Sequence, residues 1–457
     1  MALDRSIRPL TTEEIDFEIP KIESFELNNI KVFYVERHNL PIIRLSAIFE
    51  GGSRLDPDGK KGLVNLFTMM LDEGAGKFNA LELSDEFELL GSSFDSSCSN
   101  DAIYIGCRSI KENFEKTLEL LCTIINEPRL DVNDFEREKR KILTRLIQLK
   151  DDGEEIANNI FDYLLFKKNH PYAFPVIGYE EDIINITIND IVNYYRNNFL
   201  TKKLHILVAG NITGDELKLY IEKYFGSWQG NEFNTLPKFD ISLTQEQKIY
   251  FFHKPDTVQT ELRIGYLTEK RNKNNYFSKL ILNLILGGQF SSRINLNLRE
   301  NKGYTYGAFS TFSYLKDVGM FFVSTSVNIE NTANAVKEIF YELNEIKKGV
   351  SEDELDFAKS SLIRKYPSNF ENIRQIVSAL NRLVTSDLTV DDIYNYVSNI
   401  KKVSLVDVKK AAEEHITPDN CIIILVGDKE KMIPQLKELN FAEVIEVDSK
   451  GEPIIKN

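Results

Sequence analysis

Residues 49–74 read Phe-Glu-Gly-Gly-Ser-Arg-Leu-Asp-Pro-Asp-Gly-Lys-Lys-Gly-Leu-Val-Asn-Leu-Phe-Thr-Met-Met-Leu-Asp-Glu-Gly. The stretch begins at the end of a strand predicted over 42–49 and continues through a turn rich in Gly, Pro and Asp. Apolar residues then recur at helical spacing, which predicts a helix that starts near Gly62. The segment therefore predicts a strand, a turn and a helix over 62–71 that packs in a core.

The composition is that of a globular protein with more than one domain. The chain has 457 residues, of which 42% are apolar and 28% charged, and this length suggests at least two domains. Its net charge of −14 argues against nucleic acid as a partner and favours cationic partners or peptides. The five His are scattered, and the four Cys form no C-x-x-C pair, so neither residue type predicts a metal site.

The sequence predicts no membrane span. The longest apolar run, Cys421 to Val426, is the length of a strand, whereas a membrane helix needs about 20 residues. The first ten residues carry charges and have no apolar stretch behind them, so no signal peptide is visible. We therefore expect a cytoplasmic protein, with a periplasmic location left open if a leader has been removed.

Two parts of the chain repeat each other. Thr187 opens a predicted helix that leads to a strand over 204–208, and Ser404 opens a similar helix 217 residues later, leading to a strand over 421–426. A long helix near Asp134 has a counterpart near Glu354, with Lys139 matching Lys359. Repetition on this scale indicates a tandem of two similar units.

Each unit is predicted to be an α+β layer structure. Strands, a helix, a hairpin and further helices follow one another in each half, and hairpins favour a mixed or antiparallel sheet with helices packed on one face. The segment around 228–247 carries Gly, Asn and Pro without periodicity. We therefore expect an N-terminal domain over 1–230, a linker over 231–247 and a C-terminal domain over 248–457.

This duplicated frame resembles the inverted-zincin (pitrilysin/insulinase) peptidases, in which two such units form half of a clamshell chamber and the first apolar helix carries H-x-x-E-H. In that motif two histidines bind zinc and the glutamate activates water. The three motif positions fall here on Asn65, Thr68 and Met69. The family's further zinc ligand, a glutamate on a later helix, would fall on Thr144 or Arg145. None of these side chains suits zinc, so the resemblance implies a degenerate site that binds no metal.

A second resemblance lies in the other half, over 286–307. In the family an Arg and a Tyr seven positions apart reach across the chamber to the zinc site, and Arg299 and Tyr306 have that separation. A guanidinium suits substrate carbonyls or carboxylates, and a phenol can donate to an oxyanion. Tyr304 is the alternative, because a shift of register would change which ring faces the chamber.

A short glycine-rich segment precedes this pair. Gly287, Gly288, Ser291 and Ser292 resemble the substrate loop of the non-catalytic subunit of the mitochondrial processing peptidase. The alternative is that the two glycines simply end a helix.

Taken together, the resemblance implies the zinc-lacking subunit of a heterodimeric metallopeptidase. Arg299 and Tyr306 would act in trans on peptides at the zinc of a homologous partner that has an intact H-x-x-E-H, and this chain alone would be inactive. The alternative is a scaffold protein of the same fold, like the core proteins of the respiratory cytochrome complex, or a homodimeric peptide-binding protein.

Overall fold

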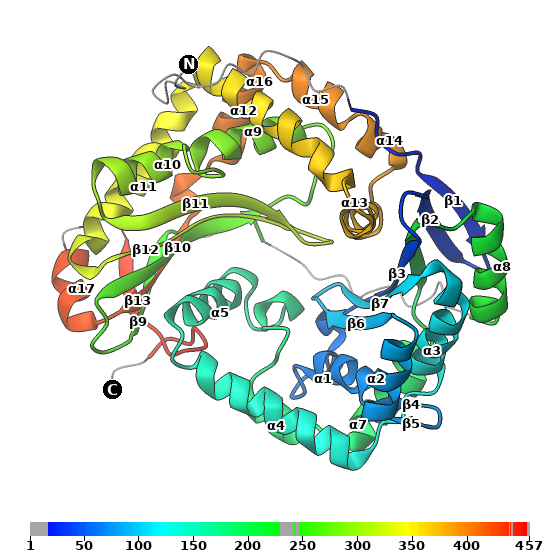
Figure 1. Ribbon diagram of the computed structural model, residues 1–457. Helices are drawn as coiled ribbons and strands as arrows, with labels where there is room; N and C mark the ends of the chain where they lie inside the picture. Colours follow the sequence, from blue (N-terminus) through cyan, green and yellow to red (C-terminus); the bar gives the residue numbers. More distant parts are fainter. Residues whose placement is uncertain (1–16, 229–241, 244–245, 438, 440–441, 455–457) are drawn as a thin grey trace, which may run out of the picture.

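Two six-stranded sheets organise the computed structural model, which describes residues 17–228, 242–243, 246–437, 439 and 442–454. They lie in opposite halves of the molecule (Figure 1). The first has the order β1-β2-β8-β3-β7-β6 and the second β11-β12-β10-β13-β9-β14. The first sheet comprises β1 Glu23–Leu27, β2 Ile30–Glu36, β3 Ile42–Glu50, β6 Ser93–Cys98, β7 Ala102–Ile110 and β8 Leu204–Gly210. The second comprises β9 Lys248–His253, β10 Gln259–Thr268, β11 Thr305–Tyr314, β12 Gly319–Asn328, β13 Ile422–Gly427 and β14 Glu443–Glu446.

The two sheets share one topology, which confirms the tandem of similar units. In each half a strand from late in the sequence inserts between two earlier strands: β8 pairs parallel with β2 and antiparallel with β3, and β13 does the same with β9 and β10. Every residue of β8 and β13 is buried, as expected for central strands covered on both faces. The outermost strands differ, because β1 is antiparallel to β2 whereas β14 is parallel to β9.

Helices follow the sequence pattern closely. The helix predicted near Gly62 begins at Leu63, and the fold has two further short strands, β4 Gly74–Ala75 and β5 Phe78–Asn79. The first half contains α1 Leu63–Met69, α2 Ala80–Leu89, α3 Phe114–Asn126, α4 Val132–Leu149, α5 Gly153–Phe166, α6 Glu180–Asn185, α7 Ile188–Tyr194 and α8 Gly214–Phe225. The second contains α9 Tyr276–Leu286, α10 Arg293–Asn295, α11 Thr332–Glu345, α12 Glu352–Lys365, α13 Ile373–Thr385, α14 Val390–Tyr394, α15 Tyr396–Lys402, α16 Leu405–His415 and α17 Lys429–Leu436. None of the helices in the described residues is long and apolar enough to cross a membrane.

The repeat extends to individual side chains. Thr187 and Ser404 each close a capping box at the start of a helix, which satisfies backbone N–H groups there. Lys139 donates to the carbonyls of Ile184 and Ile186 at the end of α6, and Lys359 donates to a carbonyl near the end of α15. The two matched lysines therefore make the same kind of contact, a cation at a helix C-terminus.

The second face of each sheet is covered by a helix from the other half. α13 packs on the first sheet, where Ile376 and Leu380 join the same buried cluster as Leu207. α5 packs on the second sheet, where Ile160 joins Ile424. The sequence predicts helices on one face of each sheet. The helices exchanged between the halves, α13 and α5, cover the other face, because both faces of each sheet carry apolar side chains that must be removed from water. The linker expected over 231–247 falls mostly outside the described residues.

Candidate functional site

The turn after β3 fixes the start of α1. The Asp56 carboxylate accepts hydrogen bonds from the backbone N–H groups of Gly62 and Val64, both at 2.8 Å. Gly62 has φ +95°, and a Cβ there would lie 2.6 Å from the Ile177 carbonyl oxygen, so only glycine fits. Burial raises the pKa of Asp56 to about 7. The frame of a strand, turn and helix is therefore built by these specific contacts.

The polar side chains at the degenerate positions on α1 form their hydrogen bonds within that helix, and the Thr68 carbonyl also accepts from the Ser96 hydroxyl of β6 at 3.2 Å. The Thr68 hydroxyl donates to the Val64 carbonyl at 2.8 Å, and the Asn65 amide lies 3.9 Å from the Met69 sulfur. On α4, the exposed Thr144 hydroxyl likewise donates back to its own helix. Arg145, also exposed, donates to Gln148 at 3.4 Å. Within the described ranges no three His, Cys, Asp or Glu residues are grouped as metal ligands would be.

A pair of carboxylates connects the end of the α1 segment to α4. Glu73 and Glu138 are both buried, and burial, followed by the hydrogen bond with Glu138, raises the pKa of Glu73 to about 7. Arg137 forms an ion pair with Glu73, and Lys141 lies 2.5 Å from Glu138. Two side-chain cations of α4 thus supply the positive charge beside this acidic pair. The sequence predicts only a long helix near Asp134 and gives no signal for this pair.

Arg299 and Tyr306 lie on two neighbouring segments. Arg299 belongs to the wide helical turn η6, Leu296–Asn301, and its guanidinium lies 4.4 Å from the centroid of the Phe290 ring. Tyr306 lies near the start of β11, where the register against β12 shifts. Its side chain is 89% exposed. Tyr304 instead packs against the second core, so of these two rings Tyr306 is the one that is free to meet another molecule.

The glycine-rich segment is tied to the same strand. Gly287 ends α9, and its carbonyl accepts from the Ser310 N–H of β11 at 3.0 Å. A Cβ at Gly287 would come 2.4 Å from the Ser310 hydroxyl, so the close approach of loop and strand requires glycine. A Cβ added at Gly288 would lie 2.8 Å from the side-chain amide nitrogen of Asn283. Ser291 is exposed, whereas Ser292 is buried at the start of α10.

Asn295 holds the loop, the turn and the strand together, and the sequence carried no signal for it. Its side chain is buried. The amide donates to the Phe290 carbonyl at 2.6 Å, and its oxygen accepts from the Ala308 N–H at 3.0 Å. Since Arg299 lies over Phe290 and Ala308 follows Tyr306 by two residues, this amide helps to fix the relative position of the predicted pair, together with the hydrogen bond from the Tyr304 N–H to the Leu298 carbonyl at 2.8 Å.

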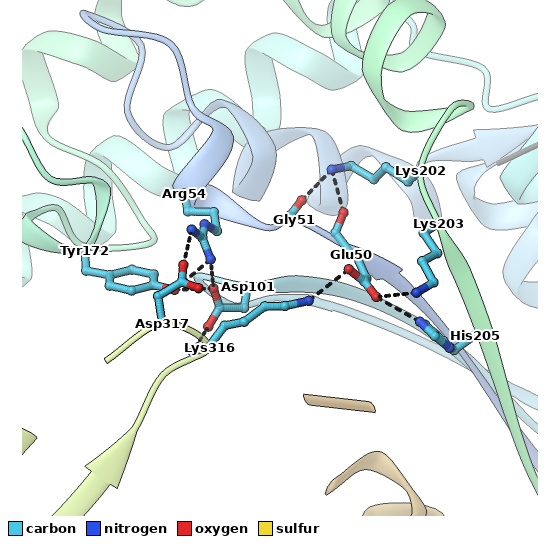
Figure 2. Close-up of polar contacts among 10 residues, drawn as sticks. All are labelled: Glu50, Gly51, Arg54, Asp101, Tyr172, Lys202, Lys203, His205, Lys316 and Asp317. Carbon is cyan, nitrogen blue, oxygen red and sulfur yellow. Dashed lines mark hydrogen bonds and ion pairs between the residues drawn. The ribbon is translucent and has the colours of Figure 1, made fainter. Parts of the chain in front are cut away.

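A buried polar cluster joins the two halves (Figure 2). Arg54, whose side chain is 0% exposed, contacts Asp101 and Tyr172 of the first half at 2.9 Å each. It also contacts Asp317, which lies in the turn between β11 and β12 of the second half, at 2.6 Å. A buried guanidinium needs such partners because an isolated buried charge is very costly. The turn of the second half is therefore anchored on the first.

Glu50 forms the second anchor in Figure 2. Its carboxylate lies 2.9 Å from the Lys316 ammonium and 3.0 Å from the His205 ring, with Lys203 at 3.6 Å. Burial disfavours the ionised form, but the hydrogen bond from His205 and the charge of Lys316 outweigh it and hold the pKa of Glu50 well below its usual range. Glu50 is thus an ionised carboxylate between three nitrogen groups.

Comparisons with known proteins agree with this architecture. Residues 31–169 match the family described as Insulinase (Peptidase family M16), and residues 185–362 match the Peptidase M16 inactive domain. A relative from Helicobacter pylori named Non-peptidase homolog YmxG is 24% identical, over 89% of this chain and 94% of its own. A second H. pylori relative, named Zinc protease PqqE, is 23% identical over 87% of this chain and 90% of its own.

A solved structure has the same fold. The peptidase M16 inactive domain from Pseudomonas fluorescens superimposes with a TM-score of 0.82 and 23% identity, covering 89% of this chain and 98% of that one. This likeness covers both halves, so the two-unit architecture is that of the solved protein.

Proposed function

The chain belongs to the M16 insulinase family of peptidases, and on this premise we propose that it is the zinc-lacking subunit of a heterodimeric metallopeptidase. Its second half would face the zinc-bearing half of a homologous partner that has an intact H-x-x-E-H. Peptides would be enclosed between the two subunits, each contributing half of a clamshell chamber. Zinc would be held by the partner, and this chain would contribute Arg299 and Tyr306.

The residues at the motif positions support a role without a metal of its own. Asn65, Thr68 and Met69 offer no imidazole or carboxylate, and zinc sites are built from imidazole, thiolate or carboxylate ligands. The name of the H. pylori non-peptidase relative agrees with this assignment. The same organism also has a relative named as a zinc protease, so both kinds of chain occur side by side in one species.

The observation that carries the proposal is the exposure of Tyr306 on an anchored strand. Its ring is 89% exposed, although the flanking residues Thr305 and Ala308 pair with β12 and Ala308 also donates to Asn295. An exposed phenol on a rigid element is suited to donate to an oxyanion that forms outside this chain, a contact worth about 3 kcal/mol when preorganised. Arg299, one-third exposed beside Phe290, would bind a substrate carbonyl or carboxylate.

A scaffold function is the second candidate. The relative named as a non-peptidase favours it, since that name denies peptidase activity to that protein. A scaffold of the same fold would keep both sheets and the exchanged helices but would not need Tyr306 exposed. The two candidates therefore differ in what a partner with an intact zinc motif would gain from this chain.

Reconstitution distinguishes them. The chain is purified alone and mixed with the family member from the same genome that has H-x-x-E-H, and the cleavage of unfolded peptides is measured with the zinc content of each chain. The peptidase proposal expects zinc on the partner only, no cleavage by either chain alone and cleavage by the mixture. A complex that forms but cleaves no faster than the partner alone would favour the scaffold.

A further inference from the structure

A cavity lies where the end of β11 meets α13, and none of the residues discussed so far belongs to it. In Figure 1 the end of β11 lies beside α13. The cavity has a volume of about 330 Å³, within the range of small-ligand sites. Its wall includes Phe312 and Tyr314 of β11, Tyr276 of α9, Tyr396 of α15 and Arg382 of α13. The two halves of the molecule meet here, because α13 also packs on the first sheet.

Two guanidinium groups in this wall lack an acidic partner among the described residues. Arg271 lies with its guanidinium 3.8 Å from the centroid of the Tyr276 ring. Arg382 donates to the Asn369 side-chain oxygen at 3.2 Å. In the part of the chain that the structure describes, neither forms an ion pair with a carboxylate. The acidic group in the wall, Asp392, is already paired with Lys273 at 2.8 Å. The cavity therefore presents net positive charge on a protein whose net charge is −14.

The aromatic wall adds apolar surface and free hydroxyls. Tyr366 and Tyr396 stack at 4.2 Å between centroids, and Tyr276 lies 6.2 Å from Tyr314. Within the described residues, the hydroxyls of Tyr276, Tyr314 and Tyr396 have no hydrogen-bond partner in the protein. A phenol beside a guanidinium can donate to the same anion. The wall thus combines donors for a carboxylate with ring faces that suit another ring.

We propose that this cavity binds the carboxylate of a compound that carries an aromatic ring next to it, as at the C-terminal end of a peptide with an aromatic last residue. The guanidiniums of Arg271 and Arg382 bind the carboxylate as charged donors, and the ring stacks among the tyrosines. The peptide as the source of this group rests on the proposed function. Binding itself requires only this chain.

The test is calorimetric titration of the isolated full chain with N-acetyl-L-phenylalanine and with its amide, which has the same ring and no charge. Because a charged hydrogen bond contributes more than a neutral one, we expect the acid to bind at least about tenfold more tightly than the amide. N-acetyl-L-alanine, which lacks the ring, is expected to bind more weakly than N-acetyl-L-phenylalanine. These comparisons use the wild-type chain and do not depend on a variant folding.

Variants then assign the site. Arg271→Gln and Arg382→Gln are each expected to weaken binding of the acid about tenfold. Arg374→Gln, at an exposed position of the same α13 outside the cavity, is expected to leave it unchanged. Equal affinity for acid and amide, or an unchanged affinity in both arginine variants, would overturn the proposal. Binding of inorganic phosphate as tight as that of the aromatic acid would also overturn it, since the site would then recognise charge alone.

The outcome is separable from the reconstitution experiment. If the chain binds the acid but does not activate a partner, the carboxylate site is supported and the proposed function is contradicted. If the chain activates the partner but binds no acid, the proposed function is supported and the carboxylate site is contradicted.

Discussion

The ammonium of Lys316 lies 2.9 Å from the carboxylate of Glu50, although the two residues are 266 positions apart and belong to different halves of the molecule. Lys316 is in the turn between β11 and β12, and Glu50 ends β3. Together with the Arg54 cluster, this pair fixes the second sheet on the first. The relative position of the two halves is thus determined by a few partly buried charges as well as by the exchanged helices.

Removing the charge of Lys316 should destabilise the junction. In Lys316→Met the partly buried Glu50 loses one of its cations, and we expect a loss of about 1–3 kcal/mol in the free energy of unfolding. Urea unfolding followed by circular dichroism measures it. Lys316→Arg keeps the charge and serves as the matched control. A Met variant with the wild-type midpoint would show that the pair contributes nothing.

The loop that precedes Arg299 should be sensitive to acid. Glu354 at the start of α12 accepts a bidentate pair of bonds from Arg293, at 2.6 and 2.8 Å, and the hydrogen bond from Arg293 is the main reason that its pKa is lowered to about 2. A carboxyl whose pKa is lower in the folded state stabilises the fold above its unfolded pKa. This contribution is lost as the pH falls from about 4.5 toward 2.

The measurement compares wild type with Glu354→Gln. After allowing for solvent screening we expect the variant to lose about 1 kcal/mol at pH 7 and the difference to shrink toward pH 3. Thermal unfolding at the two pH values provides the readout. A difference that stays constant, or grows, as the pH falls would contradict the assignment of the shift to this pair.

Separating the halves should expose the face that α13 covers. A fragment of residues 17–228 lacks α13, so the buried side chains of Phe33, Val35, Ile48 and Leu207 would meet water. Exposed apolar area of this kind promotes association. We expect the fragment to bind a hydrophobic dye and to aggregate, and co-expression with residues 246–457 to restore a soluble complex. A fragment that is monomeric and binds no dye would mean that the exchanged helix is dispensable.

Local features of the fold were predictable from the sequence. The capping residues Thr187 and Ser404 and the uninterrupted apolar strands near 204 and 421 depend on neighbours in the chain, and they identified both the elements and the repeat. The helix after Gly62 begins one residue later. These features are specified by a few adjacent residues, so a single sequence carries them.

Contacts between distant segments were not predictable. The apolar faces of α5 and α13 look like those of any amphipathic helix, and nothing in their spacing indicates that each covers the sheet of the other half. No neighbouring residue in the sequence indicates that the Asn295 side chain joins the loop at Phe290 to the strand at Ala308. The ion pairs of Lys316 and Asp317 form because the turn between β11 and β12 lies against the first half. The complete topology, and not the local sequence, determines the position of that turn.

The most direct measurement of the central claim is the turnover of the reconstituted complex containing Tyr306→Phe. Tyr304→Phe, the same substitution at the neighbouring ring that packs in the core, is the matched control, and the affinity of each variant for the partner is measured in parallel. If the Tyr306 hydroxyl donates to the oxyanion at the partner's zinc, kcat falls about 100-fold in Tyr306→Phe with the affinity unchanged, and Tyr304→Phe keeps wild-type turnover. Wild-type turnover in Tyr306→Phe would contradict the account.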